Sequence, residues 1–334
     1  MKPNNTFEEI LNTLKKSQNI LLASHTGADL DSIGSNIALK LILKNLGINA
    51  DFYSVDNLPV GLTDLVDCQH VNAPVDIATI DLSKYDTFLG LDVDTTDRVT
   101  KTDGFKLPEN IKTKVYIDHH QTSLGMGDLN YVDKNASSAT LLIFRMSKEL
   151  NIPLNKQIGE YILLGILGDT GTFQFSNTHP EDLKAVTELI EKYDVNMFNM
   201  IYNMTFNEPI ELFKMKRIIY NNLKVDFENR FAYTTYTQKE KADAGIDPNI
   251  GLPAVSDTIK RLKGVDFVFV ISETKDKVNE YHLGMRSHEK NFDVSKIAIK
   301  LGGGGHKPAA AAKLTNQKSI DEAIQTVIST IAEM

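Results

Sequence analysis

The sequence has one cysteine, Cys68, in 334 residues, and it has no long apolar run. A single thiol excludes a disulfide framework and a cysteine-based zinc site, and it favours a reducing, cytoplasmic compartment. No apolar stretch approaches the ~20 residues that a membrane-crossing helix needs, so we expect no membrane partner. The polar start of the chain, Met1 to Glu9, lacks the apolar segment of a signal peptide.

Positive charge is also scarce. The chain has 36 Lys and Arg residues against 44 Asp and Glu residues, a formal net charge of −8. Because proteins that bind long duplex nucleic acid usually carry a basic face, this balance argues against such a partner. Small anionic substrates stay compatible, since bound metal ions reverse the charge of a site locally. The length of the chain favours two domains.

Short apolar runs alternate with helical patterns in the first half of the chain. The runs that we expect to be strands are 20–24, 51–55, 87–91 and 114–117. This alternation predicts an α/β domain with a parallel sheet and helices on both faces. Strand-like runs at 231–236, 265–271 and 280–285 predict a second, smaller α/β domain across a cleft, with a helix through Val255, Ile259 and Leu262. We therefore predict a first domain at 1–192, a helical linker at 193–215 and a second domain at 216–334.

Acidic and imidazole side chains follow the predicted strands of the first half. They are His25, Asp29 and Asp31 after the first strand, Asp92 after the third, Asp118, His119 and His120 after the fourth, and Asp169 at the end of a later helical pattern. In open α/β sheets the carboxyl ends of the strands border one crevice, so separate strands can bring these groups together. Each group alone has a simpler interpretation, because a strand-end aspartate is usually a helix cap or a turn former. Their shared position favours one site.

Four carboxylates in one site repel one another and cannot all ionise without cations. Two divalent metal ions would supply four positive charges to balance the four carboxylates. Oxygen-rich ligation with some imidazole favours Mn²⁺, with Mg²⁺, Co²⁺ or Zn²⁺ as substitutes. A pair of metal ions is a recurring device for phosphoester cleavage. A single structural zinc is the poorer interpretation, since such sites favour cysteine ligands.

A glycine run in the second half indicates a place where an anion can bind. Gly302 to Gly305 can bring backbone N–H groups close to a phosphate because glycine has no Cβ. His306 and Arg286 add side-chain donors. A flexible turn is the simpler interpretation, but the small residues from Ala309 to Ala312 favour a shaped loop. The run is not a P-loop, because no Lys-Ser or Lys-Thr pair follows it.

Five segments in combination resemble the motifs of the DHH phosphoesterases. They are His25 to Asp31 with Gly34-Ser35, Leu91-Asp92 with Arg98, Asp118-His119-His120, Gly165 to Gly171, and Gly303 to His306 with Ala309-Ala310. The last segment is similar to the signature of the DHH-associated C-terminal domain. Within the family, the two-domain layout looks most like the bifunctional oligoribonuclease and pAp-phosphatase group. Ala28, Ala311 and Gln174 depart from the family pattern, which often has proline, glycine and a basic residue there.

The resemblance implies a role for each matching residue. His25 and Asp29 would hold one Mn²⁺, Asp31, His119 and Asp169 would hold the second, and Asp92 would bridge the two. His120 would lie beside the scissile phosphate, and Asp118 would orient His119, so that the catalytic set is His120, Asp92 and Asp118. The substrate would be bound by Arg98, His120, Arg286, Ser287, Gly303, Gly304, Gly305 and His306.

The expected activity is Mn²⁺-dependent hydrolysis of phosphoester bonds. Substrates would be short oligoribonucleotides, degraded from an end to mononucleotides, 3′-phosphoadenosine 5′-phosphate (pAp), or both. Linear or cyclic dinucleotides, pApA or cyclic di-AMP, are the alternative. A family II pyrophosphatase fits less well because its C-terminal domain lacks the glycine-histidine signature, and a RecJ-type exonuclease fits less well for chain length and acidity. A non-catalytic nucleotide sensor would not need the complete ligand set. The oligomeric state, a homodimer included, stays open.

Overall fold

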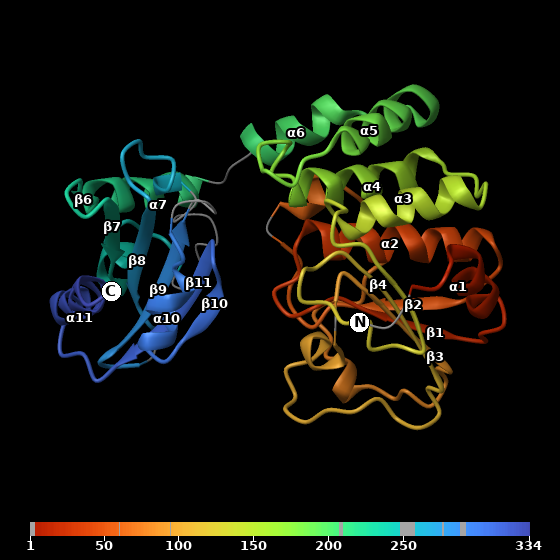
Figure 1. Cartoon of the computed structure of the whole chain (residues 1–334), viewed down its shortest axis with the longest axis horizontal. Helices are drawn as coiled ribbons and strands as arrows, with labels where there is room; N and C mark the ends of the chain where they lie inside the picture. Colours follow the sequence, from red (N-terminus) through yellow and green to blue (C-terminus); the bar gives the residue numbers. More distant parts are fainter. Residues whose placement is uncertain are drawn as a thin grey trace. The chain divides into compact units, whose positions relative to one another are not determined.

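The computed structural model describes residues 4–59, 61–93, 95–206, 210–247, 258–275, 277–287 and 292–334. The chain divides into two compact units, residues 1–207 and 208–334, and the division lies within the stretch that the sequence predicts as the linker. Figure 1 shows the first unit from red to green and the second from green to blue. Within the described ranges, the longest apolar helices fall short of what crossing a membrane requires.

The first unit is built on a five-stranded sheet in the order β2-β1-β3-β4-β5, with every neighbouring pair parallel. The strands are β1 (Ile20–Ala23), β2 (Ala50–Tyr53), β3 (Thr87–Leu91), β4 (Thr113–Asp118) and β5 (Leu129–Val132). The parallel α/β architecture predicted from the sequence is confirmed. Strand β5 is absent from the prediction because it has four residues and includes a buried asparagine, Asn130, so its apolar run is weak.

Helices cover one face of this sheet. They are α1 (Phe7–Leu14), α2 (Leu30–Asn45), α3 (Ala139–Glu149), α4 (Lys156–Asp169), α5 (Pro180–Tyr193) and α6 (Met197–Phe206). Helix α2 lies next to the sheet, α4 packs on it, and α5 and α6 pack on α4 (Figure 1). Apolar side chains of alternate strand residues, such as Leu22, Leu89 and Ile117, join these helices in one core.

The opposite face of the sheet differs from the prediction of helices on both faces. Leu21, Phe88 and Tyr116 point to that face and pack against buried side chains of the segments 77–85 and 93–111. As far as the structure describes these segments, their helical turns are the short 3₁₀ turns Ile77–Thr79 and Thr96–Val99. The long connections after β2 and β3 are rich in proline, glycine and aspartate, which favour turns over regular helices.

The second unit is built on a six-stranded sheet in the order β10-β11-β9-β8-β7-β6, in which only β7 and β8 pair in parallel. The strands are β6 (Lys224–Asp226), β7 (Phe231–Tyr236), β8 (Phe267–Glu273), β9 (Glu280–Ser287), β10 (Gly304–His306) and β11 (Ala309–Thr315). The helices are α7 (Ile210–Asn221), α8 (Gln238–Asp243), α10 (Ser295–Lys300) and α11 (Ile320–Ala332). Helices α10 and α11 pack on one face, and α7 packs on the other face over β7 and β8. The predicted helix through Val255 begins outside the described residues.

The glycine run differs from the loop that the sequence predicts. Gly304 to His306 form the edge strand β10, which pairs antiparallel with Ala309 to Ala311. A Cβ on Gly303 would collide with the carbonyl oxygen of Ala311, and a Cβ on Gly305 would lie 2.5 Å from the Cα of Ala310. The glycines are therefore needed for this tight hairpin, and the alanines opposite them serve the same close approach.

Candidate metal centre

Three neighbouring parallel strands end at the predicted ligands. His25 lies two residues beyond β1, Asp92 directly follows β3, and Asp118 is the last residue of β4. The backbone of Asp92 is in the left-handed region, with φ 58°, and its N–H donates to the carbonyl of Ile117 at 3.1 Å. Aspartate tolerates this conformation better than most residues, and the turn directs the carboxylate between the ends of the strands.

His25 is oriented by its own loop. Its Nδ1 lies 2.9 Å from the carbonyl oxygen of Thr26, which can only accept, so Nδ1 carries the proton and Nε2 faces the acids. Nε2 is 3.4 Å from Asp92 Oδ2 and 3.8 Å from Asp29 Oδ2. Burial lowers the pKa of His25, but hydrogen bonds to Asp29 and Asp92 outweigh it and raise the pKa to about 10.

The ring of His119 faces a second group of carboxylates through its Nε2, as the ring of His25 faces the first. Its Nε2 lies 3.2 Å from Asp92 Oδ1, 3.2 Å from Asp169 Oδ2 and 3.7 Å from Asp31 Oδ2. Burial lowers the pKa of His119, but the hydrogen bond to Asp92 and the charges of Asp31, Asp92 and Asp169 raise it to about 10. The two imidazoles thus balance part of the negative charge of the carboxylates.

Asp31 is fully buried and is held by the first turn of α3. Its Oδ2 accepts the backbone N–H of Ala139 at 2.6 Å, and its Oδ1 accepts that of Thr140 at 2.9 Å. The N-terminus of a helix favours an anion at this position. Burial and the nearby charge of Asp92 still raise the pKa of Asp31 to about 7. In the same way burial and Asp31 raise the pKa of Asp169 well above its usual range.

Glycines allow the helices that carry these acids to approach. A Cβ on Gly34 in α2 would lie 2.6 Å from the carbonyl oxygen of Tyr161 in α4. A Cβ on Gly165 would lie 2.6 Å from Asp31 Oδ1 and would also collide with Thr140. Real Cβ atoms do not pack this closely, so the position of Asp31 depends on two residues without side chains.

The donor set fits two divalent cations. Donor atoms lie within 4.8 Å of one another in three groups: His25, Asp29 and Asp92; Asp31, His119 and Asp169; and Asp92, His119 and His120. Asp92 is 1% exposed, and in the described part of the chain its buried Oδ2 accepts no hydrogen bond of ordinary geometry, although His25 Nε2 lies 3.4 Å away. A buried carboxylate oxygen without a partner is costly unless a cation meets it. Oxygen atoms with some imidazole nitrogen suit Mn²⁺ and similar ions.

Asp118 contacts both histidines that follow it, but only one of them through the ring. Its Oδ1 lies 2.8 Å from the ring Nδ1 of His120, whereas from His119 it accepts only the backbone N–H, also at 2.8 Å. The expected role of Asp118 in orienting His119 therefore stays a prediction, with a contact to the backbone of His119 and not to its ring. Burial raises the pKa of the Asp118 carboxyl, but the hydrogen bond to His120 and the charge of that ring outweigh burial. The pKa therefore lies below its usual value, which favours the anion. Burial lowers the pKa of His120, but Asp118 and Asp92 raise it above its ordinary value.

The predicted substrate residues lie in both units. Arg98 is half-buried in the 3₁₀ turn Thr96–Val99, and its carbonyl accepts the N–H of Thr26 at 2.6 Å. Arg286 lies on β9 opposite Ala309 of β11. The Ser287 hydroxyl is buried, 2.6 Å from the carbonyl of Phe292 and 3.1 Å from that of Lys307. These contacts of Ser287 are structural, and its role in substrate binding stays a prediction, as do those of the glycines and His306 on β10.

Asp56 is a supporting residue that the sequence prediction omits. Its Oδ2 accepts the backbone N–H of Gly27 at 2.6 Å, and its other oxygen pairs with Lys101. This contact fixes the loop between His25 and Asp29. Asp56 directly follows the predicted strand 51–55, so the signal used for the other strand-end acids also marked it. The N–H donors of Ala139 and Thr140 carried no such signal, because they are backbone groups far from Asp31 in the sequence.

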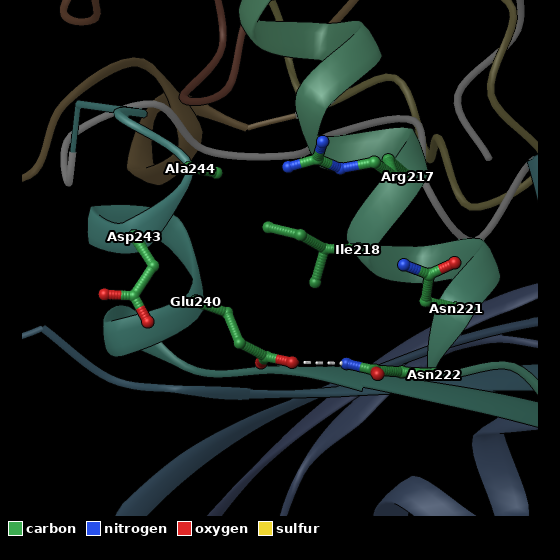
Figure 2. Close-up of a pocket in the computed structure, with 7 residues that line it drawn as sticks. All are labelled: Arg217, Ile218, Asn221, Asn222, Glu240, Asp243 and Ala244. Atoms are coloured by element: carbon green, nitrogen blue, oxygen red, sulfur yellow. Dashed lines mark hydrogen bonds between the residues drawn. The ribbon is translucent and has the colours of Figure 1, made fainter.

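The second unit has a polar hollow of about 390 Å³ between α7 and α8. It is lined by Arg217, Ile218, Asn221, Asn222, Glu240, Asp243 and Ala244 (Figure 2). Its polar groups partly satisfy one another, since Asn222 Nδ2 donates to Glu240 Oε1 at 2.7 Å. The residues of the candidate metal centre belong to the first unit and take no part in it.

Comparison with known proteins gives consistent matches over most of the chain. Residues 19–166 match the DHH family, N-terminal domain, and residues 231–333 match the DHHA1 domain. The bifunctional oligoribonuclease and PAP phosphatase NrnA of Thermus thermophilus is 28% identical over 316 residues, which are 94% of this chain and 89% of that protein. The protein of the same name from Bacillus subtilis is 26% identical over 316 residues, 94% and 95% of the two chains. The crystal structure of an exopolyphosphatase-related protein from Bacteroides fragilis has the same fold, with TM-score 0.86 at 18% identity over 98% of this chain and 95% of that one.

Proposed function

The chain belongs to the DHH family of phosphoesterases and carries a DHHA1 domain, and we propose that it is a Mn²⁺-dependent hydrolase of small nucleotide substrates. The proposed reactions are the removal of mononucleotides from an end of short oligoribonucleotides and the dephosphorylation of pAp. Support for these substrates comes from the names of the relatives in Thermus thermophilus and Bacillus subtilis.

The position of Asp92 is the observation that carries the proposal. Its two carboxylate oxygens face different histidines, with Oδ2 3.4 Å from His25 Nε2 and Oδ1 3.2 Å from His119 Nε2. We infer that Asp92 would contribute to the binding of two cations, one of them held with His25 and Asp29 and the other with Asp31, His119 and Asp169. Two divalent cations, when bound, supply charge that acidifies a water molecule and stabilises the leaving oxygen.

His120 is the proposed donor to the phosphate. Because its Nδ1 faces Asp118, Nε2 is the ring nitrogen that can meet a phosphate oxygen. A raised pKa keeps a proton on the ring over more of the neutral range, so that Nε2 can neutralise charge developing on the phosphate. Asp118 holds the ring in place and stabilises its charged form.

Substrate binding is assigned to residues of both units. Arg98 and Arg286 are proposed to bind phosphate groups, because a guanidinium donates two parallel hydrogen bonds to phosphate oxygens. The backbone of Gly303 to Gly305 and His306 are proposed to bind the nucleotide beside Arg286. The N–H of Gly303 already donates to the carbonyl of Ala298 at 2.8 Å, whereas Gly304 to His306 form an edge strand that, within the described residues, pairs on one side only.

A substrate panel tests the proposal directly. The purified protein would be incubated with pAp, di- to pentaribonucleotides, pApA, cyclic di-AMP and pyrophosphate, with Mn²⁺ or with EDTA, and the products separated. Release of mononucleotides from the oligonucleotides, or of phosphate from pAp, with Mn²⁺ only is the expected result. Asp92→Asn should abolish turnover, while Asp103→Asn, at an exposed aspartate of the same unit, should not. The proposal would be contradicted if the protein hydrolysed only pApA, cyclic di-AMP or pyrophosphate. Turnover that survives EDTA would also contradict it.

A further inference from the structure

One face of the second unit's sheet carries basic side chains on β9 and β11. Alternate residues of each strand point to opposite faces. On β9, Tyr281, Leu283 and Met285 are buried against α10 and α11, so His282, Gly284 and Arg286 point to the other face. On β11, Ala310, Ala312 and Leu314 are buried, so Ala309, Ala311 and Lys313 share the face of His282.

The register of the two strands groups these residues. Lys313 lies directly opposite His282, Ala311 lies opposite Gly284, and Ala309 lies opposite Arg286. Directly opposite side chains in an antiparallel pair are neighbours, with Cβ atoms about 5 Å apart. The face therefore has Arg286 at one end and the pair His282 and Lys313 at the other, with residues of little or no side chain between them.

The surface between the two ends is open to a ligand. A Cβ built on Gly304, which pairs with Ala311, would meet no atom of the described residues within 4 Å. A Cβ built on Gly284 would meet only the His282 ring, with Cε1 at 3.9 Å. The imidazole of His282 thus borders a flat surface that is formed by the backbone of Gly284 and the methyl group of Ala311.

The charge of this face is unusual for an acidic chain. Arg286 and Lys313 are cations, whereas the formal net charge of the whole chain is −8. Burial and the charge of Lys313 lower the pKa of His282, so the ring is mainly neutral at pH 7 and offers a flat surface and one N–H donor. Glu280 is the next residue of β9 on the same face, and its carboxylate pairs with Lys277 at 3.4 Å.

We propose that Lys313 and His282 form a second nucleotide subsite, in which Lys313 binds a backbone phosphate and the His282 ring contacts a base or ribose lying on the floor of Gly284 and Ala311. Bases of single-stranded RNA commonly stack on histidine and other flat side chains. The inference rests on the proposed function, and it specifies the substrate class as single-stranded oligoribonucleotides that extend beyond the nucleotide at Arg286.

Length distinguishes this subsite from binding at Arg286. His282 and Arg286 are four positions apart on β9, which is roughly 13 Å along a strand. A nucleoside bisphosphate such as pAp has a single nucleoside, which the proposed mode places beside Arg286, whereas an oligonucleotide has further nucleotides for the second subsite.

Replacing the pair tests the subsite. The double variant Lys313→Met with His282→Asn changes two exposed side chains, so the core of the unit stays intact. We expect KM for a pentaribonucleotide to rise about tenfold or more, since stacking on one side chain is worth that much, with kcat nearly unchanged. KM and kcat for pAp should stay within about twofold of wild type, because a tenfold rise in KM requires the loss of a stacking contact that pAp does not make in this subsite.

Salt dependence gives a second readout that a loss of stability would not change. One phosphate contact contributes a slope of about −0.7 in a plot of log affinity against log salt for a single strand. The slope for the pentaribonucleotide should therefore become shallower by about that amount in Lys313→Met. Lys296→Met is the matched control, because Lys296 is exposed on α10, on the opposite face of the sheet.

The outcomes separate this inference from the proposed function. Equal effects on pAp and on the pentaribonucleotide, or no effect on either, would overturn the subsite. If the wild-type protein hydrolyses none of these substrates, the proposed function fails. Fluorescence anisotropy with a labelled pentaribonucleotide then decides the subsite alone. Weaker binding in the double variant than in Lys296→Met supports it, and equal binding overturns it.

Discussion

Gly165 lies so close to Asp31 that a side chain there would collide with the carboxylate. A Cβ at this position in α4 would be 2.6 Å from Asp31 Oδ1 and would also meet the side chain of Thr140. The absence of a side chain lets α2 and α4 approach and lets Asp31 reach the N-terminus of α3, where it accepts two backbone N–H groups. The geometry of one proposed metal ligand is thus coupled to helix packing.

Gly165→Ala should therefore weaken metal binding. Overpacking typically costs about 1–3 kcal/mol, whereas alanine gains up to about 1 kcal/mol of helix propensity. We expect a lower free energy of unfolding in urea and a weaker affinity for Mn²⁺, measured by calorimetry. Gly159→Ala in the same helix is the control, since its Cβ would be 2.8 Å from Val195 Cγ2 and away from the carboxylates. Equal Mn²⁺ affinity in both variants would contradict the coupling.

The sequence alone predicts that the candidate metal ligands at the ends of the strands lie close together. Parallel strands end at one edge of a sheet, so acids and histidines that directly follow buried runs, such as His25, Asp92 and Asp118, are expected to meet. Residues 20–23 and 88–91 are continuous runs without polar side chains, so the sequence shows where each run ends. The order of the strands in the sheet, by contrast, needs the structure.

Contacts between distant backbone groups could not be predicted. Nothing in the sequence around Asp31 indicates that the N–H groups of Ala139 and Thr140 cap its carboxylate. The glycine run was predicted as a loop, because a hairpin depends on register with Ala309 to Ala311 and not on the propensity of glycine. Chain geometry also decides which of two adjacent histidines meets Asp118.

Two substitutions at Asp92 should separate its charge from its backbone conformation. Asp92→Asn keeps a residue that tolerates φ 58°, whereas Asp92→Ala adds a left-handed strain of about 1–2 kcal/mol. Both should abolish turnover and the rise in melting temperature that Mn²⁺ causes by binding the folded state. Without added metal, the alanine variant should melt at a lower temperature than the asparagine variant in differential scanning fluorimetry. An asparagine variant that Mn²⁺ stabilises as well as wild type would exclude Asp92 as a ligand.

Asp51 should make the first unit sensitive to acid. Its Oδ2 accepts hydrogen bonds from Lys84 and from the Tyr85 hydroxyl, each at 2.7 Å. Burial raises the pKa of Asp51, but these bonds outweigh it and hold the pKa below its usual range. A lowered folded-state pKa gives stability that is present above the unfolded pKa of about 3.9 and is lost as pH falls through the folded value.

The Asp51→Asn variant measures this contribution. At pH 7 it should be less stable than wild type by roughly 0.5–1 kcal/mol, a modest value because the side chain is partly exposed. The difference should shrink as the pH falls below about 4, where the unfolded chain takes up a proton at Asp51, and should be lost at the lower pKa of the folded state. Urea unfolding at several pH values checks this, with Asp103→Asn as the control. A difference that stays constant with pH would contradict the assignment.

Asp118→Asn should reduce turnover without removing metal binding. Asparagine can still accept from the His119 N–H and the His120 ring, but it removes the negative charge that favours a protonated His120. Loss of a supporting contact of this kind typically costs about 10–100-fold, and we expect it in kcat. Because the Asp118 side chain contacts the ring of His120 and not that of His119, calorimetry should give nearly wild-type Mn²⁺ affinity. His119→Asn should lose that affinity in the same experiment. If Asp118→Asn loses Mn²⁺ as severely as His119→Asn, then Asp118 supports the metal ligand and not the phosphate-facing histidine.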